Sequence, residues 1–285
     1  QRFDKAAETA VKLFEQAVSE GTEDARAYTL LRPRQRDSAL QHFTNRAEFN
    51  TFMTRFGILF SKQRMKIAIG RDKLLIQASN ALDDLVRIQN AITERLREWY
   101  SLHYPEFKEN DPEPNILAYG LREQVPDYTD SSGVDLAESD LAALKDYATL
   151  LRSLKSERKA LERYIQTTTR ELCPNTSTVV DPLMAAKLIA LAGSIERLAR
   201  LSSSTIQLLG AEKALFRHLK KQGKSPKFGI IFADPRIQNA DTDRRGKVAR
   251  VLASKIMLAA RIDFYSGRDD KEKLTKDLNE ELQKV

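Results

Sequence analysis

The stretch Ala78–Trp99 reads ASNALDDLVRIQNAITERLREW and carries a regular apolar seam. Its apolar residues recur in steps of three and four, as in a heptad repeat: Ala78, Leu82, Leu85, Ile88, Ile92, Leu96 and Trp99. Such a seam requires a partner helix. After a Pro- and Gly-containing connector at residues 105–134, a second seam supplies one: Leu141, Leu144, Ala148, Leu151, Leu154, Leu161, Ile165 and Leu172. Together the seams predict a long antiparallel coiled-coil hairpin over residues 71–172.

This hairpin buries little apolar surface by itself, so we interpret it as a homodimerisation element. The residues assigned to the dimer contact are Leu82, Leu85, Ile88, Ile92, Leu144, Leu151, Leu154 and Leu161. The alternative is an intramolecular hairpin that only spaces two domains. Periodicity does not distinguish the two.

The segments on either side of the hairpin also have a helical pattern, and the chain as a whole is predicted to be all-α. Residues 1–70 form a helical or α/β region, with helical spacing over 3–20 and 37–56. Residues 173–268 form a compact helical domain, in which Asp181 and Pro182 begin a buried apolar helix that extends to Leu198. Residues 269–285 are a charged amphipathic tail.

Composition limits the cellular setting. The 285 residues are 41% hydrophobic and 31% charged, which is typical of a folded protein, and there is no apolar run long enough for a membrane span. Cys173 is the only cysteine, which favours a reducing compartment, so we expect a cytosolic or nuclear protein. Because the chain begins with Gln1, we expect that an N-terminal part is absent.

Positive charge is concentrated in one window. Between Gly210 and Arg261 there are thirteen Lys and Arg against four acidic residues, a balance of +9 compared with +7 for the whole chain. Few acids are available for pairing, so the window is typical of a surface that binds phosphates. The alternative is a merely solvated face or one that meets acidic protein partners.

A catalytic or metal site is not indicated. The histidines, His42, His103 and His218, fall on different predicted elements, and Cys173 has no adjacent base. No Gly-rich phosphate loop or metal-ligand motif occurs in the sequence. We therefore predict a chain that is not an enzyme and holds neither metal nor cofactor.

One string, Leu209–Leu219 (LGAEKALFRHL), resembles the Nop domain, specifically that of the Nop-family core proteins of archaeal box C/D small ribonucleoproteins. Supporting matches occur in the same order along residues 70–268. They are Arg97–Glu106, Leu188–Ser194, Ser204–Gln207, Arg244–Arg250 and Ala259–Gly267.

The resemblance implies a scaffold that binds kink-turn RNA together with a small kink-turn-binding protein and tethers the methyltransferase fibrillarin. S-adenosylmethionine would belong to fibrillarin, and residues 1–70 would be the remnant of the fibrillarin-docking domain. The residues expected to face the RNA and its bound protein are Gly210, Ala211, Glu212, Lys213, Arg217, His218, Lys220, Lys221, Lys224, Gln238, Asn239, Arg244, Arg245, Lys247 and Arg250.

Two positions depart from the family pattern, because Phe228 and Asp234 stand where the family commonly has histidine. A carboxylate near a phosphate is unfavourable, so the departure calls the RNA contact of this loop into question. No long Lys-rich tail is present, which favours an archaeal, cytoplasmic protein over a nucleolar one. A coiled-coil adaptor that binds acidic partners without RNA is the alternative function.

Overall fold

The structure, a computed structural model, describes residues 43–118, 131–221 and 223–284. All regular structure in these ranges is helical, which confirms the predicted all-α fold. The expected helix at 3–20, Leu40 and His42 lie outside the described residues, as do residues 119–130 of the connector. The chain divides into two compact units, residues 1–70 and 71–285.

In the described part of the first unit, helix α3 (Arg46–Ala68) carries a row of phenylalanines. Asn45 caps this helix, because its Oδ1 accepts from the backbone N of Glu48 at 2.8 Å. The Phe43 ring contacts both Phe49 and Phe52, and the contacts continue from Phe52 to Phe56 and from Phe56 to Phe60, with centroid separations of 5.3 to 6.4 Å. The expected aromatic cluster is present, but the helix begins later and ends later than the predicted 37–56.

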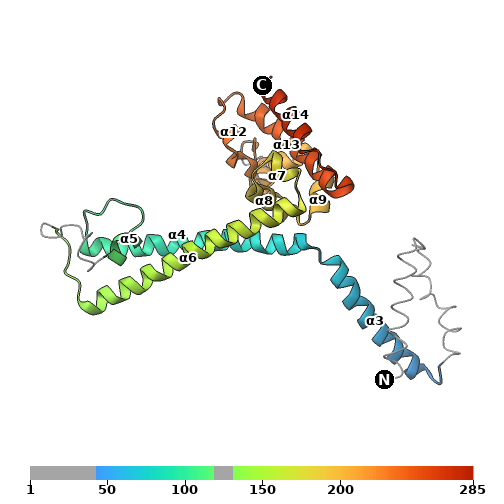
Figure 1. Cartoon of the computed structure of the whole chain (residues 1–285), viewed down its shortest axis with the longest axis horizontal. Helices are drawn as coiled ribbons and strands as arrows, with labels where there is room; N and C mark the ends of the chain where they lie inside the picture. The colour runs from blue at the N-terminus through green and yellow to red at the C-terminus, as the bar shows by residue number, and fades with distance from the viewer. Residues whose placement is uncertain (1–42, 119–130, 222, 285) are drawn as a thin grey trace. The chain divides into compact units, whose positions relative to one another are not determined.

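The predicted hairpin consists of α4 (Arg71–His103) and α6 (Glu138–Leu172), which pack along each other (Figure 1). The two helices are antiparallel. Near the turn, Leu102 O accepts from the backbone N of Val134 at 2.9 Å, and at the opposite end Leu75 and Ile165 share one hydrophobic cluster. A separate cluster near the turn includes Leu96, Leu144 and Leu151.

Polar contacts fix the turn end of the hairpin. The short helix α5 (Glu113–Ala118) packs on α6, and the buried Glu113 carboxylate binds Arg152 at 2.8 Å and Lys155 at 2.7 Å. Glu106 accepts from Ser131 Oγ at 2.8 Å and from the backbone N of Ser132 at 3.1 Å. These contacts join both sides of the connector to the helices.

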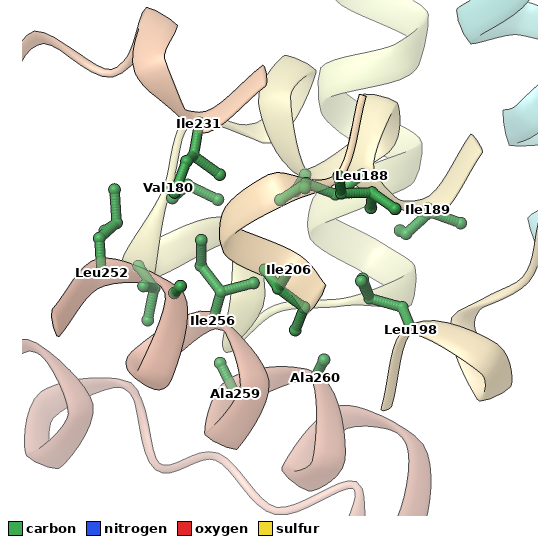
Figure 2. Packing of buried hydrophobic residues seen from close by; sticks show 14 of the residues in the cluster. Val180, Leu188, Ile189, Leu198, Ile206, Ile231, Leu252, Ile256, Ala259 and Ala260 are labelled. Carbon is green, nitrogen blue, oxygen red and sulfur yellow. The ribbon is translucent and has the colours of Figure 1, made fainter. Parts of the chain in front are cut away.

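The rest of the second unit is a group of short helices around α13, which we call the head (Thr176–Gln283). Its elements are α7 (Thr176–Val179), α8 (Pro182–Ala192), α9 (Ile195–Arg200), α10 (Ser203–Leu208), α11 (Glu212–Leu219), the 3₁₀ helix η2 (Ile230–Ala233), α12 (Pro235–Gln238), α13 (Arg245–Arg261), the π-helix η3 (Ile262–Ser266) and α14 (Lys271–Gln283). Figure 2 shows side chains from α8, α10 and α13 converging in its core.

The head and the root of the hairpin share one hydrophobic core. Leu75 and Ile76 of α4 belong to the same cluster as the buried leucines and isoleucines of α8 and α13. Two polar contacts reinforce this junction: Lys73 Nζ donates to Gly193 O at 2.6 Å, and Lys187 Nζ lies 2.8 Å from an Asp83 carboxylate oxygen. The hairpin is therefore continuous in packing with the head.

Asp263 connects three parts of the head. Its carboxylate accepts from the backbone N and side chain of both Asn175 and Thr176, at 2.7 to 3.0 Å. Asn175 in turn donates to Arg268 O at 2.7 Å and accepts from the backbone N of Asp270 at 2.9 Å. This network holds the end of α13 against α7 and the start of α14.

Two helix boundaries differ from the sequence predictions. Asp181 does cap α8, accepting from the backbone N of Leu183 at 2.9 Å, but the single helix predicted as far as Leu198 is wrong. Gly193 has a φ of +89°, a left-handed conformation that ends α8, and Ser194 then caps α9. Asp241 and Thr242 are of the residue types that commonly cap a helix, but α13 begins at Arg245 without a side-chain cap.

The residues of the predicted charged tail form α14. Leu274 and Leu278 are buried in the head cluster, and Lys255 of α13 pairs with Glu281 at 2.8 Å. Helix α14 therefore packs as part of the head.

Candidate functional site

Among the described helices of the head with eight or more residues, α11 is the one without a buried residue. None of its residues is buried, and Phe216 and Leu219 are 62% and 67% exposed. Leu219 therefore lies on the exposed side of α11. Ala214 and Leu215 are half-buried and attach the helix to the head. An eight-residue helix with two large exposed apolar side chains is typical of a surface that contacts another molecule.

Two glycines fix the position of α11. Gly210 has a φ of +89°, and a Cβ there would lie 2.5 Å from Ile230 Cγ2. Gly229 packs so closely that its Cβ would lie 1.9 Å from Leu209 O, and the backbone N of Ile230 donates to that oxygen at 2.8 Å. Only glycine fits such a close backbone approach. The chain before α11 and the chain before η2 are therefore held together.

The acidic residue at the start of α11 has a local structural role. Glu212 Oε1 accepts from the backbone N of Gly210 at 2.8 Å. At the other end of the helix, His218 Nδ1 lies 2.9 Å from Gly223 O. Because a carbonyl oxygen can only accept, Nδ1 carries the proton in this contact. Of the predicted interface residues, Glu212 and His218 thus stabilise the turns that flank α11.

Most basic residues of the window have no acidic partner within the described ranges. Nine of them are exposed and form no ion pair with another described residue: Lys213, Arg217, Lys220, Lys221, Lys224, Lys227, Arg244, Lys247 and Arg250. They come from α11, from the connection that follows it and from the first turns of α13. Eight of them belong to the predicted interface, and Lys227 is an addition.

Four other basic residues of the window serve the fold instead: Arg236, Arg245, Lys255 and Arg261. Arg245 was predicted to face RNA. Its guanidinium instead donates to Ala240 O and Gln238 O, both at 3.0 Å, and lies 5.9 Å from the centroid of the Phe232 ring. The side chains of Gln238 and Asn239 are exposed.

Asp234 does not face a bound phosphate, contrary to the concern raised by the sequence. Its side chain is 4% exposed, and both carboxylate oxygens accept from the Arg236 guanidinium, at 2.7 and 2.8 Å. Asp234 also caps α12. Phe228, the other departure, stacks on Phe232 with a centroid separation of 5.2 Å. Both residues are therefore part of the internal packing of the loop.

The residues predicted for dimerisation are divided by the hairpin packing. Leu144 and Leu151 are fully buried inside the chain, whereas Ile88 is 50% exposed. The remaining positions are half-buried: Leu82, Leu85, Ile92, Leu154 and Leu161. Leu85 and Leu161 line a groove of about 430 Å³ on the hairpin together with Ala81 and Tyr164.

The described residues contain no arrangement suited to a metal ion, because no three His, Cys, Asp or Glu side chains gather there. Burial raises the pKa of the Cys173 thiol well above its usual range, so the thiol stays protonated. His103 is buried at the hairpin turn, where Nδ1 lies 2.7 Å from Val134 O. In the same ranges, none of the helices combines the length and hydrophobicity of a membrane span.

A cleft beside α13 was missed by the sequence reasoning. It has a volume of about 480 Å³ and is lined by residues from three separate segments: Ser204, Gln207, Leu208, Pro226, Lys227, Thr242, Asp243, Gly246 and Arg250. Only Arg250 was among the predicted interface residues. No local pattern relates segments so far apart in the chain, so their proximity appears only in the folded head.

The comparisons with known proteins agree on one family. The Nop family model, described as snoRNA binding domain, fibrillarin, matches residues 117–285. An uncharacterized NOP5 family protein of Methanocaldococcus jannaschii is 35% identical over 270 residues, which cover 86% of this chain and 65% of that protein. Nucleolar protein 58 of Schizosaccharomyces pombe is 35% identical over 75% of this chain and 47% of its own length.

A further relative and a solved structure also match this chain. Human Nucleolar protein 56 is 33% identical over 74% of this chain and 40% of its own length. The chain thus spans between 40% and 65% of the length of these relatives. A chain in a crystal structure of a fibrillarin/Nop5p complex has the same fold, with a TM-score of 0.54 at 23% identity over 87% of this chain and 83% of that one. Because the family model matches more than half of the sequence, the chain belongs to the Nop family.

Proposed function

We propose that this chain is a non-catalytic scaffold of a box C/D guide ribonucleoprotein that directs 2′-O-methylation of RNA. In this role it binds a kink-turn RNA together with its small kink-turn-binding protein, and it tethers fibrillarin. The family relationship supports the proposal, since the matching family model is described by snoRNA binding and fibrillarin. Tethering would raise the effective concentration of the methyltransferase at the RNA, so no chemical step is required of this chain.

One observation carries the proposal: α11, the connection after it and the start of α13 carry nine exposed basic side chains without an ion pair among the described residues, and α11 also exposes two large apolar side chains. Lys213 and Arg217 are on α11 itself, beside Phe216 and Leu219. Phosphates would bind the basic residues, whereas the apolar pair suits a protein surface. A surface of this composition fits RNA that already carries a bound protein. The predicted interface residues are retained in this proposal, with Glu212, His218 and Arg245 supporting the surface through its turns.

The other partners follow from the same proposal. Residues 1–70 would dock fibrillarin, which would bring its own S-adenosylmethionine. The hairpin would form a homodimer through the groove lined by Leu85 and Leu161, with the exposed Ile88 nearby on α4. We expect a cytoplasmic location in an archaeal cell and a nucleolar one in a eukaryotic cell, where relatives named nucleolar proteins occur.

Gel-shift assays with a kink-turn RNA and the small kink-turn-binding protein test the RNA-binding proposal. A ternary complex is expected at moderate salt. Its affinity should fall by three or more orders of magnitude between about 50 and 200 mM salt, because six or more phosphate contacts displace counterions. An adaptor for acidic proteins would bind without RNA, and the absence of any ternary complex would overturn the proposal.

Light scattering tests the dimer. Ile88→Asp places a charge on a side chain that is already half exposed, so the single chain should keep its unfolding midpoint. A charge in the dimer contact should nevertheless halve the measured mass. An unchanged mass would instead favour the hairpin as an intramolecular spacer.

A further inference from the structure

The cleft beside α13 has the size and lining of a small binding site. Its volume of about 480 Å³ falls within the range of about 300–1,000 Å³ typical of small-molecule sites. One wall is α10, the second is the connection at Pro226 and Lys227, and the third is the start of α13. Backbone contacts hold the walls together, because Gln207 O accepts from the backbone N of Gly229 at 2.7 Å. The cleft is therefore part of the packed head.

Two basic side chains from different walls line this cleft. Lys227 and Arg250 both line it, and neither forms an ion pair with any described residue. Arg250 can donate two parallel hydrogen bonds to a phosphate, and Lys227 adds a second positive charge. The cleft therefore carries two side chains suited to a phosphate group.

Gly246 keeps the cleft open. It lies in the first turn of α13, where its φ is not in the left-handed region, and a Cβ there would meet no atom within 4 Å. Neither backbone conformation nor packing requires glycine at this position, and glycine weakens a helix relative to alanine. The missing side chain leaves space in the cleft, which suits close approach of a ligand.

Two hydrogen-bond acceptors face the same space. Gln207 Nε2 donates to Lys227 O at 2.9 Å, which leaves its Oε1 as an acceptor. Asp243 lines the cleft and has no basic partner among the described residues. A carboxylate repels phosphate but accepts hydrogen bonds from the amino groups of bases. The lining thus combines a phosphate-binding pair with acceptors for a base.

We propose that this cleft holds one unpaired ribonucleotide of the guide RNA, with its phosphate on Lys227 and Arg250 and its base directed to Gln207 and Asp243. The inference rests on the proposed function and adds a nucleotide site to it. Unpaired bases are the parts of RNA that proteins read by hydrogen bonding. Adenine, guanine and cytosine carry an exocyclic amino group, so they are preferred over uracil.

A steric block provides the main test. Gly246→Leu fills the cleft without changing any charge, and it should weaken the ternary complex with guide RNA and the small protein at least tenfold. The melting temperature should stay the same or rise, since leucine is the better helix former. Unchanged affinity would overturn the nucleotide site while leaving the scaffold proposal in place. Failure of the wild-type chain to form any ternary complex would overturn both.

A matched pair of charge variants tests the phosphate end. Lys227→Gln should reduce affinity three- to tenfold and should remove photo-cross-linking between this segment and 6-thioguanosine, which keeps an exocyclic amino group, placed singly at unpaired positions of the guide RNA. Lys276→Gln on α14 makes the same charge change at a side chain that is 78% exposed, and it should leave both readouts unchanged. Equal effects of the two variants would show a general charge effect and contradict the site.

The base end has its own readout. The unpaired nucleotide identified by cross-linking is replaced by each of the four bases, and the complexes are compared for the wild type and Asp243→Asn. The wild type should bind uracil most weakly, and Asp243→Asn should reduce that difference. A purely electrostatic groove would instead show equal affinity for all four bases and a uniform increase on Asp243→Asn, which would overturn the base assignment.

Discussion

Lys247 and Lys255 lie eight residues apart on α13 and have opposite surroundings. Lys247 is exposed and has no ion pair within the described residues. Lys255 is 5% exposed, and its Nζ lies 2.8 Å from Glu281 and 4.0 Å from Asp277 of α14. The first lysine is available to a partner, whereas the second joins two helices of the head.

The same division applies to the whole basic window. Nine of its Lys and Arg residues are exposed and unpaired among the described residues, and four are bound internally. Three acidic residues of the window, Glu212, Asp241 and Asp243, are exposed as well, so together with the nine exposed basic residues they carry +6, less than the +9 of the whole window. Variants of the internal group should change the free energy of unfolding, and variants of the exposed group should change RNA binding alone.

The largest effect is expected for Lys255→Glu. It places a carboxylate in a buried position facing Asp277 and Glu281, so the head should lose about 3–5 kcal/mol of its free energy of unfolding. Lys247→Glu makes the same change in charge at an exposed position and should stay within about 0.5 kcal/mol of the wild type. Urea denaturation followed by circular dichroism measures both. Equal losses would remove the distinction between the two lysines.

Arg236→Ala should have the next largest effect, about 2 kcal/mol. It leaves the Asp234 carboxylate, only 4% exposed, without its guanidinium. The value is below that for a fully buried pair because the Arg236 side chain is 35% exposed. Adding Asp234→Asn removes the buried charge while keeping a side chain that can cap α12, so the double variant should recover part of the lost stability. No recovery would mean that packing of Arg236, rather than its charge, supports the loop.

A smaller effect is expected for Arg245→Ala, about 1–2 kcal/mol, because two carbonyl oxygens lose their donor. Lys247→Ala should not change stability, but it should lower the slope of log affinity against log salt by about 0.7–0.9 for the RNA complex. Denaturation and salt titration of both variants separate the two properties. A change in the salt slope without loss of stability in Arg245→Ala would place Arg245 on the RNA surface after all.

The helical fold could be predicted from the sequence because its signals are local. The seam at Ala78–Trp99 specifies a hairpin, and Asp181 followed by Pro182 specifies the start of α8. The end of α8 was missed because a long apolar run conceals the break at Gly193, whose left-handed φ becomes apparent only in the folded chain. Periodicity thus identified the helices better than their ends.

The candidate site was predicted only in part, because pairing depends on contacts distant in sequence. Lys255 and Lys247 are equivalent by composition, and the acids that bind Lys255 lie on α14, beyond the predicted domain. The local ion pair of Asp234 with Arg236 was also missed, since spacing alone does not show that the carboxylate is buried. The excess of Lys and Arg in the window therefore predicted where the candidate site lies, but not which of these residues are exposed and which are paired inside the fold.

Glu106 is an exposed residue whose carboxylate nevertheless accepts hydrogen bonds within the fold. Hydrogen bonds from the backbone N of Ser132 and from Ser131 Oγ, with smaller contributions nearby, lower the pKa of Glu106 from 4.5 to about 2. A lowered pKa in the folded state stabilises the hairpin turn above about pH 4.5, and that contribution is lost as the pH falls towards 2. The protection factor of the Ser132 amide, which corrects for the pH dependence of intrinsic exchange, should therefore fall over this interval.

Glu106→Gln is the matched control, because the amide cannot titrate. In this variant, Ser132 exchange should be faster at neutral pH and should show no added transition between pH 4.5 and 2. If wild-type Glu106 instead titrates at its ordinary pKa by NMR, the contacts with Ser131 and Ser132 are not maintained in solution. In that case the exposed Glu106 carboxylate would also be unpaired, and its exposure alone would have identified it as a free charge.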